Sequence, residues 1–145
     1  MELYCKVTAY GLVPLYDSDY DDKKRLKVGS TVKCAITKPR NLEHHKKFFA
    51  LIRLTLDNLP EPLVRKWGVR SEEDMLKRFK RDLGMFTSTI NDRGEREIEY
   101  ESISFASMDQ TEFERFYNRC IDLILTQYIC GLKREELEEE VERYR

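Results

Sequence analysis

Residues 32–59, VKCAITKPRNLEHHKKFFALIRLTLDNL, decide how the rest of the sequence is interpreted. The first part alternates apolar and polar residues and stops at Pro39, which predicts a strand over residues 31–37. The second part repeats apolar residues at helical spacing, and Asn41 is a favourable residue to cap such a helix. The stretch therefore predicts a strand followed directly by a helix over residues 42–58.

Basic and imidazole side chains gather where this strand meets this helix. They are Lys38, Arg40, His44, His45, Lys46 and Lys47. Backbone N–H groups at the start of a helix favour an anion, so we expect a phosphate contact at this junction. Neighbouring histidines project roughly 100° apart on a helix and cannot share a metal ion. We expect one of the two to pack against Phe49 and the other to be exposed.

The remaining pattern predicts an α+β fold. Alternation predicts strands over residues 2–9, 85–90 and 95–105, the last two joined in a hairpin. Helical spacing predicts helices over residues 72–83 and 109–130, and acidic residues followed by basic ones favour a short helix over residues 17–26.

These elements predict one small antiparallel sheet packed against three main helices, the long C-terminal helix being the last. We expect one domain over residues 1–132, followed by a charged helical tail over residues 133–145. Residues 121–129 are apolar nearly all round, which predicts burial against a second copy of the chain in a homodimer.

The net charge of −1 conceals an uneven distribution. Residues 33–81 hold 13 Lys and Arg against 6 Asp and Glu, whereas the remainder holds 13 against 21. A basic centre predicts a face that attracts anions. The alternative is that acidic segments of the same chain pack against the basic ones.

Two further segments add candidates for nucleic-acid binding. Trp67 is flanked by basic residues and is either a platform for a stacked base or a cap over the core. Arg78 and Arg81 lie at the C-terminal end of a predicted helix, where the helix dipole alone also explains them. The full candidate set is Lys38, Arg40, Asn41, His44, His45, Lys46, Lys47, Arg53, Trp67, Arg78 and Arg81.

Other classes of function have little support. The sequence has no phosphate-binding loop, nucleophile elbow or zinc-protease motif, so we expect no catalytic residues, metal or cofactor. Its four cysteines form no CxxC pair, and their apolar surroundings predict buried thiols. No apolar run is long enough to cross a membrane and no signal peptide is recognised, so we expect a cytoplasmic protein without membrane contact.

The sequence KPRNLEHHKKFFALIRL, preceded by VKCAIT, resembles the hallmark of a family of small phage and prophage proteins of unknown function. This resemblance covers most of the chain. Residues 31–56 are also similar to the lambda Orf (NinB) recombination-mediator family. That similarity implies a homodimeric α+β protein that binds single-stranded DNA and helps to load a recombinase without catalysis. By position, Arg40, Asn41 and Lys46 match that family's turn and helix.

The sequence thus favours a non-enzymatic phage or prophage accessory protein that binds nucleic acid, preferably single-stranded DNA, in recombination or replication. Basic residues would neutralise the backbone and aromatic residues would contact unstacked bases. The alternative is a phage-encoded protein–protein interaction module that modulates a host protein or defence system.

Overall fold

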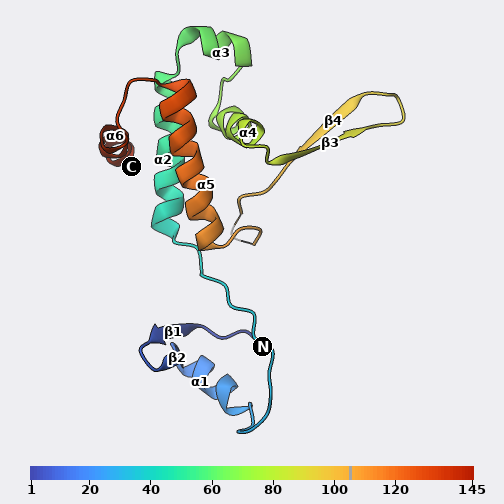
Figure 1. Ribbon diagram of the computed structural model, residues 1–145, viewed down its shortest axis with the longest axis vertical. Helices are drawn as coiled ribbons and strands as arrows, with labels where there is room; N and C mark the ends of the chain where they lie inside the picture. Colours follow the sequence, from blue (N-terminus) through green and yellow to red (C-terminus); the bar gives the residue numbers. More distant parts are fainter. Residues whose placement is uncertain (105) are drawn as a thin grey trace. The chain divides into compact units, whose positions relative to one another are not determined.

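The computed structural model describes residues 1–104 and 106–145, and α-carbon contacts divide the chain into two units. We call Met1–Ile36 the N-terminal unit and Thr37–Arg145 the helical unit, and each is described by itself (Figure 1). Both contain helices and antiparallel strands, so the expected α+β class is confirmed. The strands form two separate two-stranded sheets, and the expectation of one common sheet was wrong.

The N-terminal unit consists of a hairpin and a short helix. Strand β1 (Cys5–Thr8) pairs with β2 (Gly11–Pro14), and α1 (Asp17–Lys24) follows. The strand at residues 2–9 and the helix at residues 17–26 are confirmed at their centres. Strand β2 begins at Gly11 and ends at Pro14. Proline is tolerated there because every strand of a two-stranded sheet is an edge strand.

The strand expected over residues 31–37 is not formed. These residues are irregular, and the apolar members of the alternation are exposed, Val32 at 49% and Ile36 at 75%. No described strand pairs with this segment, and an unpaired strand has no partner for its backbone groups. Alternation alone therefore gave a wrong prediction here.

Helix α2 (Leu42–Asn58) is confirmed, with the Asn41 side chain accepting hydrogen bonds from two backbone N–H groups of its first turn. The short helix α3 (Glu61–Trp67) was not predicted. Pro60 precedes it as the N-cap residue and Gly68 follows it as the C-cap residue, in the left-handed conformation at φ 65°. Helix α4 (Glu72–Asp82) is confirmed, and Ser71 caps it.

The hairpin is confirmed as β3 (Phe86–Ile90) paired with β4 (Arg96–Tyr100), although β4 is shorter than expected and residue 105 lies outside the described residues. Helix α5 (Gln110–Leu123) lies within the helix expected over residues 109–130, and Asp109 and Glu112 form a capping box at its start. It does not continue as one long α-helix. A π-helical turn, η1 (Ile124–Tyr128), follows it, and α6 (Arg134–Tyr144) comes after a break.

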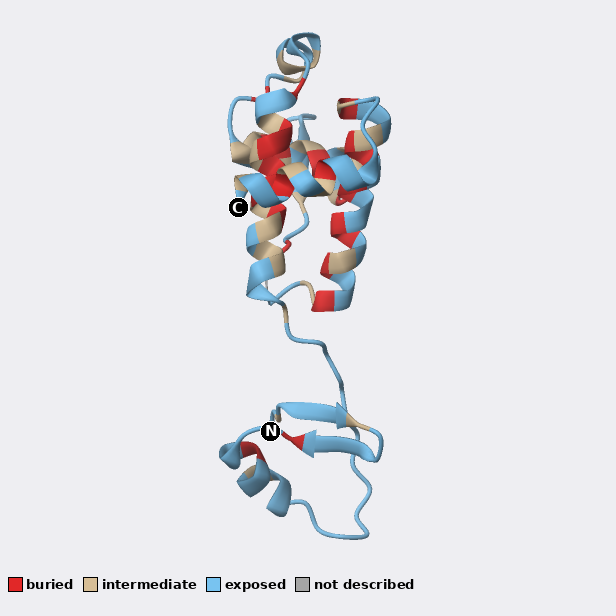
Figure 2. Ribbon diagram, turned by 90° about the vertical axis from the view of Figure 1, so that its left-hand side faces the viewer, coloured by how far each residue is buried: buried red, intermediate tan, exposed pale blue. Residues whose placement is uncertain are grey.

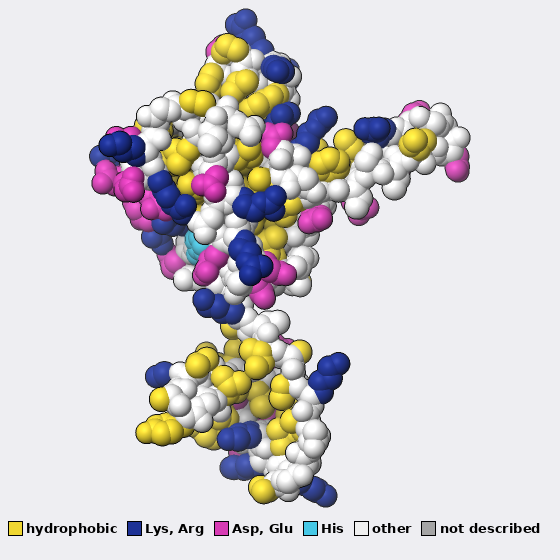
Figure 3. Space-filling model, in the orientation of Figure 1, with side chains coloured by type: hydrophobic (Ala, Val, Ile, Leu, Met, Phe, Trp, Pro, Cys, Tyr) yellow, Lys and Arg dark blue, Asp and Glu magenta, His cyan; other side chains and the backbone are white. Residues whose placement is uncertain are grey.

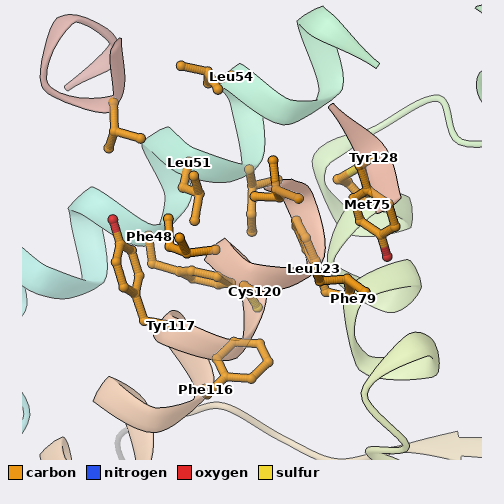
Figure 4. Close-up of a cluster of buried hydrophobic side chains, with 14 of the residues drawn as sticks. Phe48, Leu51, Leu54, Met75, Phe79, Phe116, Tyr117, Cys120, Leu123 and Tyr128 are labelled. Atoms are coloured by element: carbon orange, nitrogen blue, oxygen red, sulfur yellow. The ribbon is translucent and has the colours of Figure 1, made fainter. Parts of the chain in front are cut away.

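The buried residues belong almost entirely to the helical unit (Figure 2). Side chains of α2, such as Phe48 and Leu51, face those of α5, such as Cys120 (Figure 4). Helix α6 contributes Leu137 and Val141, both fully buried, and packs against α2. Ala50 is also fully buried, because α2 is covered on more than one side.

The apolar run at residues 121–129 finds its cover within the chain. Ile121, Ile124 and Tyr128 are at most 1% exposed in a single copy. The apolar run therefore no longer calls for a second copy, and the homodimer stays a prediction. The cysteines also differ from expectation: Cys120 is buried, but Cys5, Cys34 and Cys130 are exposed because their segments lie outside the core.

Candidate nucleic-acid interface

The residues predicted to bind nucleic acid separate into two groups within the helical unit. The first group lies just before α2 and along it, and its beginning is tied to the start of α5 through Gln110. The backbone N–H of Gln110 donates to the Lys38 carbonyl at 3.0 Å, and its side-chain oxygen accepts from the Asn41 N–H at 2.7 Å. Lys38 and Asn41 thus fix the path of the chain into α2.

Arg40 turns inward. Its guanidinium donates to the carbonyl of Ile103 at 2.6 Å and lies 3.7 Å from the centre of the Phe113 ring. Its other terminal nitrogen is 2.7 Å from Nδ1 of His45. Arg40 therefore holds the loop before α5 against α2, rather than projecting beside the helix start.

The two histidines are both half-buried. His45 packs against Phe49 as expected, with ring centres 5.0 Å apart. His44 was expected to be exposed, which was wrong because it packs edge-on against Tyr117 at 4.7 Å. Burial lowers the pKa of both histidines below its ordinary value, and the nearby Arg40 charge adds to this. The structure therefore favours two neutral imidazoles.

Acidic side chains accompany the remaining cations of this group. The ion pairs are Lys38–Glu114 at 3.7 Å, Lys46–Glu43 at 3.5 Å, Lys47–Glu142 at 3.8 Å and Arg53–Glu72 at 3.7 Å. Both signs of charge are mixed over the face shown in Figure 3. These pairs agree with the alternative explanation of the basic centre, in which acidic segments of the same chain pack against the basic ones. Helix α6 is one such segment, because its Glu142 pairs with Lys47.

The second group comes together at one place. Trp67, Arg78 and Arg81 line a single cavity of about 160 Å³. Lys77 and Tyr100 line it as well, together with Gly68, Val69 and Asp74. We call this cavity the Trp67 pocket. It joins the end of α3, the outer face of α4 and the end of β4, so two aromatic rings and three cations meet there.

Arg78 makes several contacts in this pocket. Its guanidinium lies over the Trp67 ring at 4.2 Å and makes two contacts with the Asp82 carboxylate, at 2.9 and 3.0 Å. The Tyr128 hydroxyl donates to the same carboxylate, and the Tyr128 ring packs edge-on against Trp67 at 4.9 Å. Four side chains thus form a closed network that presents a fixed, flat guanidinium.

Arg81 and Lys77 carry the charge that this network leaves available. Arg81 is exposed and forms no ion pair with any residue that the structure describes, whereas Lys77 pairs with exposed Glu73 at 3.3 Å. The Asp74 carboxylate, also in the pocket, accepts a hydrogen bond from the Arg70 N–H. Exposed cations beside a flat stacked platform suit a phosphate next to a planar group.

The candidate set from the sequence left out the other residues that line the Trp67 pocket, among them Lys77 and Tyr100. Lys77 lies four residues before Arg81 in the same helix, and this spacing could have identified it. Tyr100 comes from the hairpin, and no local pattern joins it to α4. Trp67 packs against buried Tyr128, which agrees with a cap over the core, and it also lines the pocket; its use as a platform for a base stays a prediction.

Among residues 1–104 and 106–145, no three His, Cys, Asp or Glu side chains are grouped closely enough to hold a metal ion. None of the described helices has both the length and the apolarity that crossing a membrane requires. Burial raises the pKa of the Cys120 thiol, which keeps it protonated and unreactive.

Comparison with known proteins gives a family. A family model with the description "Protein of unknown function (DUF1367)" matches residues 3–63 and 65–143 and so extends over both units. Searches of curated proteins and of solved structures returned no match.

Proposed function

We propose that this chain, which belongs to the DUF1367 family of proteins of unknown function, is a non-enzymatic accessory protein that binds single-stranded DNA. The observation that carries the proposal is the Trp67 pocket, where Trp67 and Arg78 form a flat stack beside Arg81 and Lys77. The role in phage or prophage recombination or replication rests on the resemblance of residues 31–56 stated above, and the cytoplasm is the compartment that this role requires.

The geometry of the pocket favours single strands. The flat guanidinium of Arg78 and the ring of Tyr100 are surfaces on which a base stacks, but a base reaches them only after leaving a duplex. Arg81 and Lys77 would then neutralise the phosphates on either side of that base. The start of α2 contributes less, because its cations have acidic partners. Lys77 is paired with Glu73 in the same way, so Arg81 is the cation of the pocket on which the proposal mainly depends.

Binding of a labelled single-stranded oligonucleotide, measured by fluorescence anisotropy at several salt concentrations, tests the proposal. Arg81→Gln should weaken binding and reduce the slope of log K against log salt by about one, because one phosphate contact is lost. Arg115→Gln is the matched control, since Arg115 is exposed on α5 outside the pocket. Equal effects of the two substitutions, or no effect of Arg81→Gln, contradict the proposed site.

A second candidate function, protein–protein interaction, is favoured by the surface of the N-terminal unit. Apart from Leu42, Ile90, Ile98 and Leu132, every large hydrophobic side chain exposed among the described residues lies in Met1–Ile36. So small a unit, with a two-stranded sheet and no apolar core, is marginally stable unless its surface is covered. A partner chain, including a second copy in the expected homodimer, would supply that cover.

A further inference from the structure

The hairpin β3–β4 extends away from the helices of its unit as a two-stranded ribbon (Figure 1). Between its first and last residues, Phe86 and Tyr100, nearly every side chain is exposed. The ribbon therefore buries little of either face against the rest of the unit. Its side chains, however, are not distributed at random between the two faces.

The register of the hairpin sorts the side chains by chemistry. The pairs Phe86–Tyr100, Ser88–Ile98 and Ile90–Arg96 share one face, which we call the apolar face. The pairs Thr87–Glu99 and Thr89–Glu97 share the other, which we call the acidic face. The glutamates of β4 therefore project away from the apolar face, whose charged residue in this register is Arg96.

The apolar face is continuous with the Trp67 pocket. Tyr100 belongs to both, since it lines the pocket and forms the base of the apolar face. Its ring packs against Phe86 with centres 6.3 Å apart, and Ile98 and Ile90 continue the face, exposed at 39% and 73%. A chain leaving the pocket past Tyr100 would meet apolar side chains and then a cation.

We propose that the apolar face of the ribbon is a second part of the nucleic-acid site, over which a single strand continues from the Trp67 pocket. This inference rests on the proposed function. Bases would stack on Tyr100 and pack against Ile98, and Arg96 would neutralise a phosphate. A five-residue strand is about 17 Å long, so the complete site spans several nucleotides and affinity should rise with oligonucleotide length before it levels off.

A protein strand added to the edge of the ribbon is the competing occupant of this hairpin. Edge pairing relies on backbone hydrogen bonds and depends little on which face carries a new charge. A nucleic acid lying on the apolar face, in contrast, is repelled by a carboxylate introduced on that face. The two occupants therefore respond differently to matched substitutions on opposite faces.

Ser88→Asp and Thr89→Asp make that comparison. The two residues are neighbours in β3, both are exposed, and both substitutions add one negative charge, but they face opposite sides. We expect Ser88→Asp to weaken binding of a twelve-nucleotide single strand by about tenfold and Thr89→Asp to change it by less than about twofold. Ile90→Asp places the same charge on the apolar face and should weaken binding similarly, so it replaces Ser88→Asp in the comparison if Ser88→Asp folds poorly.

Each other outcome overturns the inference in a recognisable way. Equal weakening by the two variants indicates a general effect of charge. No weakening by either, while Arg81→Gln still weakens binding, leaves the pocket as the whole site and rejects the ribbon. A native chain that binds no single-stranded DNA rejects the proposed function and this inference together. Loss of binding to a protein, with DNA affinity unchanged, identifies the ribbon as a protein contact.

Discussion

The substitution Tyr128→Phe tests the network that holds Arg78 over Trp67. It removes one hydroxyl, which donates a hydrogen bond to Asp82, and keeps the ring, which is 1% exposed and packs against Trp67 and Phe79. No cavity larger than an oxygen atom results. The change in stability therefore reports mainly the hydrogen bond to the carboxylate.

A hydrogen bond to a charged group contributes about 1.5–3 kcal/mol to the free energy of unfolding. Asp82 keeps both contacts with Arg78 in the variant, and its side chain is 16% exposed, so water partly replaces the lost donor. We therefore expect a loss of about 2 kcal/mol. This corresponds to a decrease in Tm of about 6–8 °C for a chain of this size.

Urea unfolding followed by fluorescence is the appropriate assay, because Trp67 is the only tryptophan and contacts Tyr128. The midpoint should fall by about 1 M urea without a change in slope. In an Asp82→Asn background, Tyr128→Phe should lower the unfolding free energy by clearly less, since the two residues interact directly. A midpoint unchanged by Tyr128→Phe, or an equal loss in both backgrounds, would refute the reasoning.

Three further predictions follow from other contacts. Burial lowers the pKa of His44 and His45 below 6.5, so their contribution to stability is complete above pH 6.5 and declines as the pH falls. The urea midpoint of the native chain should therefore fall between about pH 7 and 5, and it should fall less in the His44→Gln, His45→Gln double variant. An equal fall in the two proteins counts against this cause. Arg40→Ala should lower the unfolding free energy by roughly 2–3 kcal/mol while DNA affinity stays within about twofold, because Arg40 bonds to Ile103 and stacks on Phe113; a stable variant that has lost DNA binding would reverse this assignment. Light scattering at micromolar concentration tests the homodimer: a dimer that Val28→Asp dissociates assigns the contact to the N-terminal unit, whereas a native monomer at every concentration excludes the dimer.

Local signals in the sequence predicted the helices well. Asn41, Ser71 and Asp109 each cap the helix expected to follow them, because a cap needs only the residues of its own turn. Strands were harder to predict, since they depend on a partner. The hairpin has a short connection and was found, whereas residues 31–37 have the alternation of a strand without a neighbour to pair with.

The candidate site shows the same limit. The run of basic residues at the start of α2 predicted a phosphate contact. Tertiary contacts with α5, α6 and the segment before α5, however, give several of these residues acidic or backbone partners that no local pattern reveals. The three more distant candidates, Trp67, Arg78 and Arg81, were expected for separate reasons. Only the tertiary contact between Trp67, at the end of α3, and Arg78, in α4, brings them to one pocket, and only the hairpin adds Tyr100.

The position of α6 in the core has a consequence for biosynthesis. Phe48 and Ala50 are buried in α2, but the residues of α6 that help to close this core, Leu137 and Val141, are made about 90 residues later. At about 5–20 residues per second, a ribosome needs on the order of ten seconds to add them. During that interval the apolar face of α2 is incompletely covered, so the nascent chain is a substrate for holding chaperones and the helical unit completes its folding only near the end of translation.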